Sequence, residues 1–226
     1  MNISPLNCNI QKPAFEHKIS MNSDYSAKEK TIVAGTTALG IAASLALLAK
    51  KSGYSLNPLK MTKNFKNSFL AKTDFLAKEI VAIGAGTCLG GLAGGYIIDK
   101  DPVNRKAKKR EAVMQMGNIS IPILTVALFH NISKKYGKAA QAAGSLAGIF
   151  TGVYLANFLM NKLSNVLFNN KNERGVKIID FSAHVDDVVA GASYISNAGW
   201  VHNAARVIPA ILMFPGMAVG TKKPNE

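Results

Sequence analysis

Three side chains towards the C-terminal end of the chain have the chemistry and spacing of a polar path. Asp180, His184 and Asp187 recur at i, i+4 and i+7, so a single face of a helix would present all three. Such chains of carboxylates and imidazoles line proton or cation paths inside membrane proteins. Arg206 and His202, which follow after a turn, are the expected partners of the acids. The stripe therefore predicts an ion or proton path through Asp180, His184, Asp187 and Arg206.

Two other interpretations of this stripe stay open. An Asp at the centre of a bilayer costs about 3 kcal/mol, so the acids must face water, protein or a cation. An interfacial amphipathic helix, with its acids solvated near the lipid head groups, meets that requirement and is the simpler alternative. A metal site is less favoured, because transition metals recruit more His or Cys than a chain with four His and two Cys offers. No metal and no cofactor is predicted.

Enzymatic activity is the least supported class of function. The sequence contains no HExxH, Walker, CxxC or dinucleotide-binding glycine motif. The short segment GASY, which carries Ser193, is similar to the Gly-x-Ser element of intramembrane serine proteases, and His202 follows across the predicted turn. In those enzymes the Ser and the His lie on well separated spans, so we predict no catalytic residue here.

The elements that would position the stripe are apolar helices. Apolar residues gather into uncharged blocks, while almost all of the 27 Lys and Arg lie in the connections. Four blocks are long enough to cross a bilayer, at residues 31–49, 80–98, 114–132 and 139–161. The third contains Pro122, which a membrane helix tolerates where a neighbour bonds the freed carbonyl. The sequence predicts an all-α, multi-pass transmembrane helical bundle.

Local signals predict where three of these helices begin. Ser26 and Glu29 form a capping box ahead of the first span. Asp101, followed by Pro102, caps the helix that leads into the third span. Gly137 is the expected left-handed residue between spans three and four, which should therefore form an antiparallel hairpin.

The remaining segments are predicted less uniformly. Residues 1–22 are polar, contain two prolines and are expected to form a disordered tail, so that residues 23–226 make up one helical membrane domain. A basic amphipathic helix over residues 58–78 is expected to lie on the membrane surface, or alternatively to pack on the bundle. Two further spans, over residues 178–198 and 201–220, are short or charged and could enter the membrane only partly.

Two glycine ladders mark faces for close helix packing. They are Gly86, Gly90 and Gly94 in the second span and Gly144, Gly148 and Gly152 in the fourth. In lipid, helices associate through van der Waals contact, and small residues at i and i+4 let backbones approach. The simpler expectation is that the two ladders pack against each other within one chain and form a tight four-helix core. The second span also resembles glycine-zipper segments, and this resemblance implies association between subunits, either a homo-oligomer or a pore.

The net charge of +14 suits a membrane surface better than a nucleic acid. Its cations flank apolar blocks, as anionic head groups select, and are not interleaved with aromatic residues as in RNA or DNA binders. We therefore expect a multi-pass protein of the cell (plasma or inner) membrane with lipid partners and no nucleic-acid partner. A structural or interaction role through the glycine ladders is the first hypothesis, and a small channel or secondary carrier using the acidic stripe is the alternative.

Overall fold

The computed structural model describes residues 25–55, 77–169, 173–176, 179–182, 184 and 208–224. The elements in this part of the chain are α1 (Ala27–Lys51), α4 (Ala77–Ile98), α5 (Pro102–Ser133), the 3-10 turn η2 (Lys134–Tyr136), α6 (Lys138–Phe168), α7 (Ile179–Ser182), α10 (Ile208–Ile211) and α11 (Met213–Gly220). The described residues form no strand. The fold is therefore all-α.

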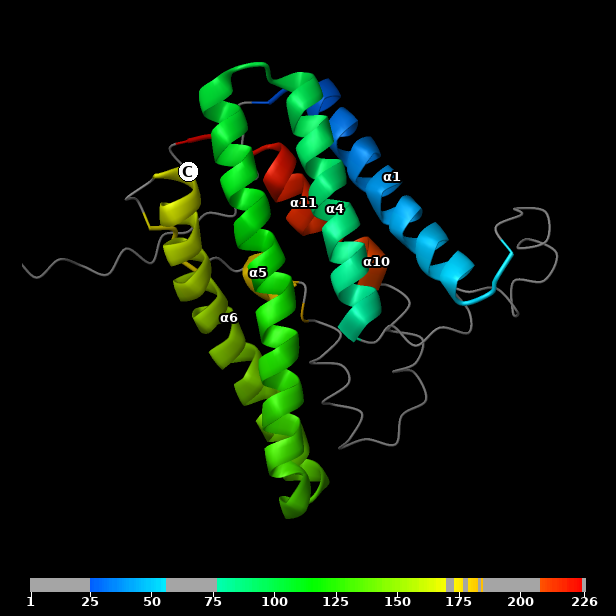
Figure 1. Cartoon of the computed structure of the whole chain (residues 1–226), viewed down its shortest axis with the longest axis vertical. Helices are drawn as coiled ribbons and strands as arrows, with labels where there is room; N and C mark the ends of the chain where they lie inside the picture. The colour runs from blue at the N-terminus through cyan, green and yellow to red at the C-terminus, as the bar shows by residue number, and fades with distance from the viewer. Residues whose placement is uncertain are drawn as a thin grey trace, which may run out of the picture.

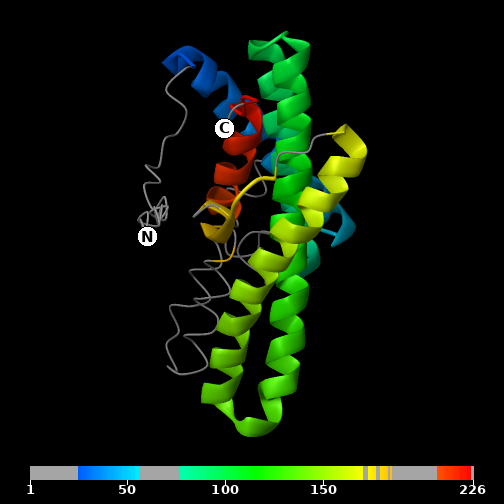
Figure 2. The same cartoon turned by 90° about the vertical axis from the view of Figure 1, so that its left-hand side faces the viewer.

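Four helices are long and apolar enough to cross a membrane: α1, α4, α5 with η2, and α6. They run alternately up and down, and each contains one of the four predicted spans (Figure 1). At 1.5 Å per residue the 22 residues of α4 extend over about 33 Å and the 32 residues of α5 over about 48 Å. The α5–α6 hairpin accordingly projects beyond α4 (Figure 2). The predicted multi-pass helical bundle is confirmed.

The three predicted start signals have the expected geometry. The backbone N–H of Glu29 donates to the Ser26 hydroxyl, and the Ser26 N–H donates to the Glu29 carboxylate at 2.8 Å, which is a complete capping box. Asp101 accepts from the backbone N–H of Val103 at 2.9 Å, ahead of Pro102. Gly137 joins η2 to α6 with φ +96° and ψ 176°, so it has the positive φ expected of the cap but an extended ψ in place of the left-handed helical value. These local predictions are confirmed because each depends on residues within one helical turn.

Several predicted elements lie wholly or mostly outside the described residues. These are the tail over residues 1–22, the surface helix over residues 58–78 except for its last two residues, which begin α4, and most of the span over residues 178–198. The span over residues 201–220 is described from Ile208 onwards. There α10 and α11 form an apolar stretch, Ile208–Gly220, which is shorter than a membrane crossing requires.

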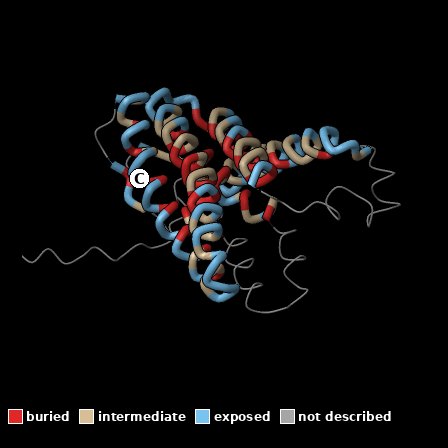
Figure 3. The backbone as a smooth tube through the Cα atoms, turned by 60° about the horizontal axis from the view of Figure 1, so that its bottom comes forward, coloured by how far each residue is buried: buried red, intermediate tan, exposed pale blue. Residues whose placement is uncertain are grey.

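The short helix α11 lies inside the bundle, next to α4 and α1 (Figure 1). Its Val219 belongs to a buried core cluster together with Leu212, Ile83 of α4 and Ile119 of α5. Buried residues follow the inner faces of the helices, and exposed residues follow the outer faces (Figure 3). The outer faces carry large apolar side chains, among them Leu39, Leu47, Leu89, Leu124, Leu128, Phe150 and Phe158. In a multi-pass membrane protein these faces meet lipid.

Candidate functional site

The first glycine ladder faces α1 of the same chain. A Cβ built at Gly86 would lie 2.5 Å from the carbonyl oxygen of Gly40, and one at Gly90 would lie 3.0 Å from the Cα of Thr37. At Gly94 the corresponding atom is the Cα of Val33, at 2.9 Å. Real Cβ atoms do not approach backbone atoms this closely, so only glycine fits here without a shift of α1.

A second edge of α4 carries Gly91 and Gly95, which face the C-terminal helix. A Cβ at Gly91 would lie 2.9 Å from the Cα of Gly216, and one at Gly95 would lie 2.7 Å from the carbonyl oxygen of Gly220. Helix α4 therefore has glycine on two sides, one towards α1 and one towards α11. This double use accounts for the crowding of glycines in its sequence.

The second ladder faces α5, its partner in the hairpin. A Cβ at Gly144 would lie 2.9 Å from the carbonyl oxygen of Phe129, and one at Gly148 would lie 2.7 Å from the Cα of Val126. The hydroxyl of Thr125 donates to the carbonyl oxygen of Gly148 at 2.7 Å. Gly152 packs on Pro122. The two predicted ladders thus face different helices of their own chain and do not face each other.

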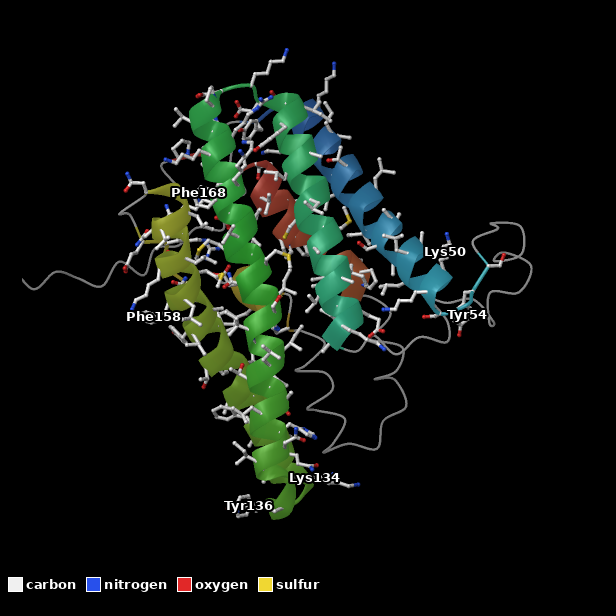
Figure 4. The ribbon with its side chains drawn as sticks, in the orientation of Figure 1. Lys50, Tyr54, Lys134, Tyr136, Phe158 and Phe168 are labelled. Carbon is white, nitrogen blue, oxygen red and sulfur yellow. The ribbon has the colours of Figure 1, made fainter. Side chains whose placement is uncertain are left out.

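Acidic and basic side chains meet at one end of the bundle, which we call the charged end. It consists of Tyr25, Asp99, Lys108, Glu111, Arg174, Asp180 and Lys222. These residues come from the start of α1, the α4–α5 connection, the start of α5, the segment after α6, α7 and the end of α11. In Figure 4 the labelled Phe168 marks this end of α6, and Lys134 and Tyr136 mark the opposite end of the hairpin.

Asp180 of the predicted stripe is held by an arginine that sequence reasoning missed. Both terminal nitrogens of Arg174 donate to Asp180, with Nη2–Oδ1 at 2.7 Å and Nη1–Oδ2 at 2.8 Å, and Nη2 also donates to Glu111 Oε1 at 3.2 Å. The Arg174 backbone is fixed in turn by Asn161 of α6, which accepts from its N–H and donates to its carbonyl. Arg174, Asp180 and Glu111 have side chains at most 5% exposed, so this is a buried ion triad.

The surroundings of Arg174 favour its charged form. Burial alone would lower the pKa of Arg174, but the charge of Glu111 and the hydrogen bonds and charge of Asp180 outweigh it and hold the pKa above its ordinary value. Lys222 approaches the second oxygen of Glu111 at 3.9 Å. Two cations and two carboxylates therefore compensate one another, which is what the desolvation cost of buried ions requires.

His184, the second residue of the stripe, bonds the backbone at the proline of α5. Its Nε2 lies 2.7 Å from the carbonyl oxygen of Asn118. Because Pro122 has no N–H, the carbonyl four residues before it has no partner within the helix. A carbonyl only accepts, so Nε2 must carry the proton and donate. His184 thereby satisfies the carbonyl that Pro122 frees.

The rest of the predicted path is not placed by the structure, since Asp187 and Arg206 lie outside the described residues. Within the part of the chain that is described, no group of three or more His, Cys, Asp and Glu side chains could hold a metal ion.

A buried polar side chain near His184, that of Asn118, has no hydrogen-bond partner among the described residues. Neither the nitrogen nor the oxygen of the Asn118 amide has a hydrogen-bond partner among the described residues, although Asn118 is 1% exposed.

A second buried ion pair at the charged end joins Lys108 and Asp99. Lys108 is fully buried, and its Nζ donates to the Tyr25 hydroxyl and to the backbone carbonyl of Lys222, each at 2.8 Å, and lies 3.4 Å from Asp99. The Tyr25 hydroxyl donates to Asp99 at 2.7 Å. Burial would raise the pKa of Asp99, but the bonds from Tyr25 and the Asp101 backbone N–H and the charge of Lys108 together hold it below its ordinary value.

A sequence signal for the charged end did exist on α5. Lys108, Glu111, Gln115 and Asn118 recur at i, i+3, i+7 and i+10, which is a polar stripe on one helical face, and Gln115 donates to Glu111 at 2.8 Å. The two partners on the other side of these contacts, Arg174 and Asp99, stand in connections without any periodic pattern. Their pairing could not be predicted from spacing.

Comparison of the chain with protein-family models, with curated proteins and with solved structures finds no match. The function is therefore argued from the geometry alone.

Proposed function

We propose that the protein is a structural protein of the cell (plasma or inner) membrane that acts through helix packing and contacts with lipid and partners. The observation that carries this proposal is the placement of the two glycine ladders, each of which faces a neighbouring helix of the same chain along its length. Glycine costs about 1 kcal/mol against Ala in a helix interior, so six retained glycines indicate that close packing is what these helices are built for.

The charged end supports the same role. Its buried cations are paired with carboxylates. Both carboxylates of the Arg174 triad are bound to Arg174 or Lys222, so neither is available to a transported cation. Breaking such a pair is costly, so the arrangement favours a bundle that keeps one conformation. We propose that the Lys-rich connections of the protein bind anionic head groups. Self-association through the glycine ladders would require the ladders to separate from the helices that they contact within the chain.

Substitution of one glycine in each ladder tests this role. Gly90→Leu and Gly148→Leu should lower the thermal stability of the purified protein in detergent without changing its oligomeric state, because the new side chain separates two helices of one chain. Gly35→Leu on α1, where nothing lies within 4 Å of the Cβ position, is the matched control and should leave the oligomeric state unchanged without lowering the stability. Loss of an oligomer with unchanged stability would instead establish a zipper between subunits.

Transport is the second candidate, favoured by the unpartnered, buried amide of Asn118 beside His184. A polar group without a partner in the bundle interior is costly unless water or a solute bonds it. Proton and cation flux into vesicles containing the purified protein tests this candidate. Flux that falls in Asn118→Leu and Asp187→Asn would support a carrier, whereas flux no greater than in protein-free vesicles would leave the structural role.

A further inference from the structure

A pocket of about 540 Å³ opens beside the charged end, between the start of α5 and the end of α6. Its basic lining residues are Lys106, Arg110, Arg174, Lys222 and Lys223, and its acidic ones are Glu111 and Glu173. Five cations line the pocket against two carboxylates, and Asp180, bound to Arg174, brings the net charge to +2. The pocket therefore attracts an anion.

Arg174 gives this pocket more than surface charge. Its side chain is 5% exposed and lines the pocket, and its Nε has no hydrogen-bond partner among the described residues. A buried guanidinium normally bonds all of its donors, because each unmade bond costs about 1–3 kcal/mol. Arg110 lies close enough for the two guanidinium groups to repel each other. Two guanidinium groups at one pocket match the oxygens of a phosphate group, which accepts several charge-assisted hydrogen bonds at once.

Apart from Asn169, the remaining lining residues of the pocket are apolar. They include Val103 and Met114 of α5 and Phe168 of α6, whose position at the end of the helix is labelled in Figure 4. A small soluble anion has no apolar surface to bury against these residues, whereas the glycerol and first methylenes of a lipid do have such surface. The pocket also lies at the correct depth, since the predicted span of α5 begins at Met114, where the pocket ends.

A second, apolar groove lies further along α5, on another face of the helix. It is lined by Cys88 and Leu92 of α4, by Met116 and Gly117 of α5 and by Met160 of α6. The groove and the basic pocket share no lining residue, and their α5 residues lie on different faces of the helix. The groove is therefore a separate apolar surface, and the lipid assignment depends on the basic pocket and its own apolar lining.

We propose that the basic pocket is a binding site for an anionic phospholipid, with the phosphate at Arg110 and Arg174 and the glycerol and first methylenes against the apolar lining residues. This inference rests on membrane embedding and is independent of the structural role, so either can fail without the other. The site would tie the bundle to one leaflet through a specific lipid, beyond the general attraction of its lysines.

The site can be tested by native mass spectrometry of the full-length protein in detergent, titrated with phosphatidylglycerol. Arg110→Gln should weaken binding by at least about tenfold, because a charge-assisted hydrogen bond is lost. Lys106→Gln, an exposed lining residue, should also weaken it and keeps the assay valid if Arg110→Gln folds poorly. Lys109→Gln is the matched control, because this exposed lysine of α5 does not line the pocket.

Two ligand controls complete the test. Phosphatidylcholine should bind more weakly than phosphatidylglycerol, and soluble glycerol 3-phosphate should compete only weakly for the site. Equal losses in Arg110→Gln and Lys109→Gln, or equal binding of the two lipids, would overturn the proposal. Glycerol 3-phosphate binding as tightly as the lipid would assign the pocket to a soluble phosphate ester and would also overturn the lipid assignment.

Discussion

The glycine contacts in the middle of the bundle and the charged end hold the same helices by opposite means. In the middle, α4 approaches α1 and α11, and α6 approaches α5, through backbone surfaces that have no side chain between them. At the charged end, long side chains meet in ion pairs, as Lys108 does with Asp99. The glycine contacts require that no side chain lies between two backbones. The ion pairs require that every charged side chain has a partner of opposite charge.

This difference decides how each region responds to change. A glycine contact is made of many small dispersion terms, so an added methyl group harms it only where a neighbour is close. A buried ion cluster is a set of large opposing terms, so removal of one member leaves the others uncompensated. The charged end should therefore show the larger single-residue effects and should alone depend on pH.

The largest expected effect is at the centre of the triad. Arg174→Met leaves Asp180 and Glu111 buried without their cation and should lower the free energy of unfolding by about 3–5 kcal/mol. Thermal unfolding in detergent, followed by circular dichroism, measures it. Arg174→Lys, which keeps the charge but loses the two-pronged bond to Asp180, should fall between the two proteins. A loss in Arg174→Met no greater than that from the exposed control Lys109→Met would contradict the buried triad.

Asp99→Asn should cost less, about 1.5–3 kcal/mol at neutral pH, because it weakens bonds to a charged group. The pKa of Asp99 is lowered in the folded state, so its contribution is fully present above the unfolded pKa of about 3.9 and is lost as pH falls through the lower folded value. The difference in free energy of unfolding between Asp99→Asn and wild type should therefore be constant from pH 5 to 8. It should shrink as the pH falls below about 4.

The control for this measurement is Asp101→Asn, which removes a neighbouring carboxylate but retains a good N-cap for α5. It should leave stability nearly unchanged at neutral pH. A gap between Asp99→Asn and wild type that widens as the pH falls would contradict the assigned interactions of Asp99.

The glycine contacts can be examined with two substitutions on one helix. Gly40→Ala should destabilise the bundle by about 1–3 kcal/mol, because its Cβ would lie 3.0 Å from the backbone carbon of Gly86 and closer still to its oxygen. Gly35→Ala, with nothing within 4 Å, should stabilise α1 by up to about 1 kcal/mol. Chemical unfolding gives the change in free energy of unfolding for each variant. Changes of the same sign would show that α1 does not lie on α4 as described.

The smallest effect concerns the coupling of His184 to Pro122. His184→Phe removes the donor to the Asn118 carbonyl and should cost about 1 kcal/mol. In a Pro122→Ala background the backbone N–H of residue 122 can bond that carbonyl, so the same substitution should cost less. A double-mutant cycle measures this coupling, and a value of zero would separate the histidine from the proline.

Sequence reasoning succeeded where the determinants are local. The four spans, the capping box at Ser26, the cap at Asp101 and the turn at Gly137 each depend on residues within a few positions of one another, and the fold class follows from them. The spacing of the glycines also marked faces of α4 and α6, but it did not identify α1 and α5 as the helices they meet.

The charged end was not predicted because its partners are remote in sequence. Arg174 and Glu111 are 63 residues apart, and Lys108 and Tyr25 are 83 residues apart. No periodicity connects such pairs, and Arg174 stands in a connection between helices. The sequence analysis therefore expected Arg206 and His202 as partners of the acidic stripe, whereas the structure pairs Asp180 with Arg174.

Disulfide formation between α1 and α4 tests the central claim, that the glycine ladders pack within one chain. The Cβ of Thr36 lies 3.3 Å from the position of a Cβ at Gly94, close to the separation in disulfides. In a background without Cys8 and Cys88, Thr36→Cys combined with Gly94→Cys should give an oxidised monomer on non-reducing gels, and Gly35→Cys combined with Gly94→Cys should not. A cross-linked dimer from separately tagged chains, one carrying each single cysteine, would contradict the claim.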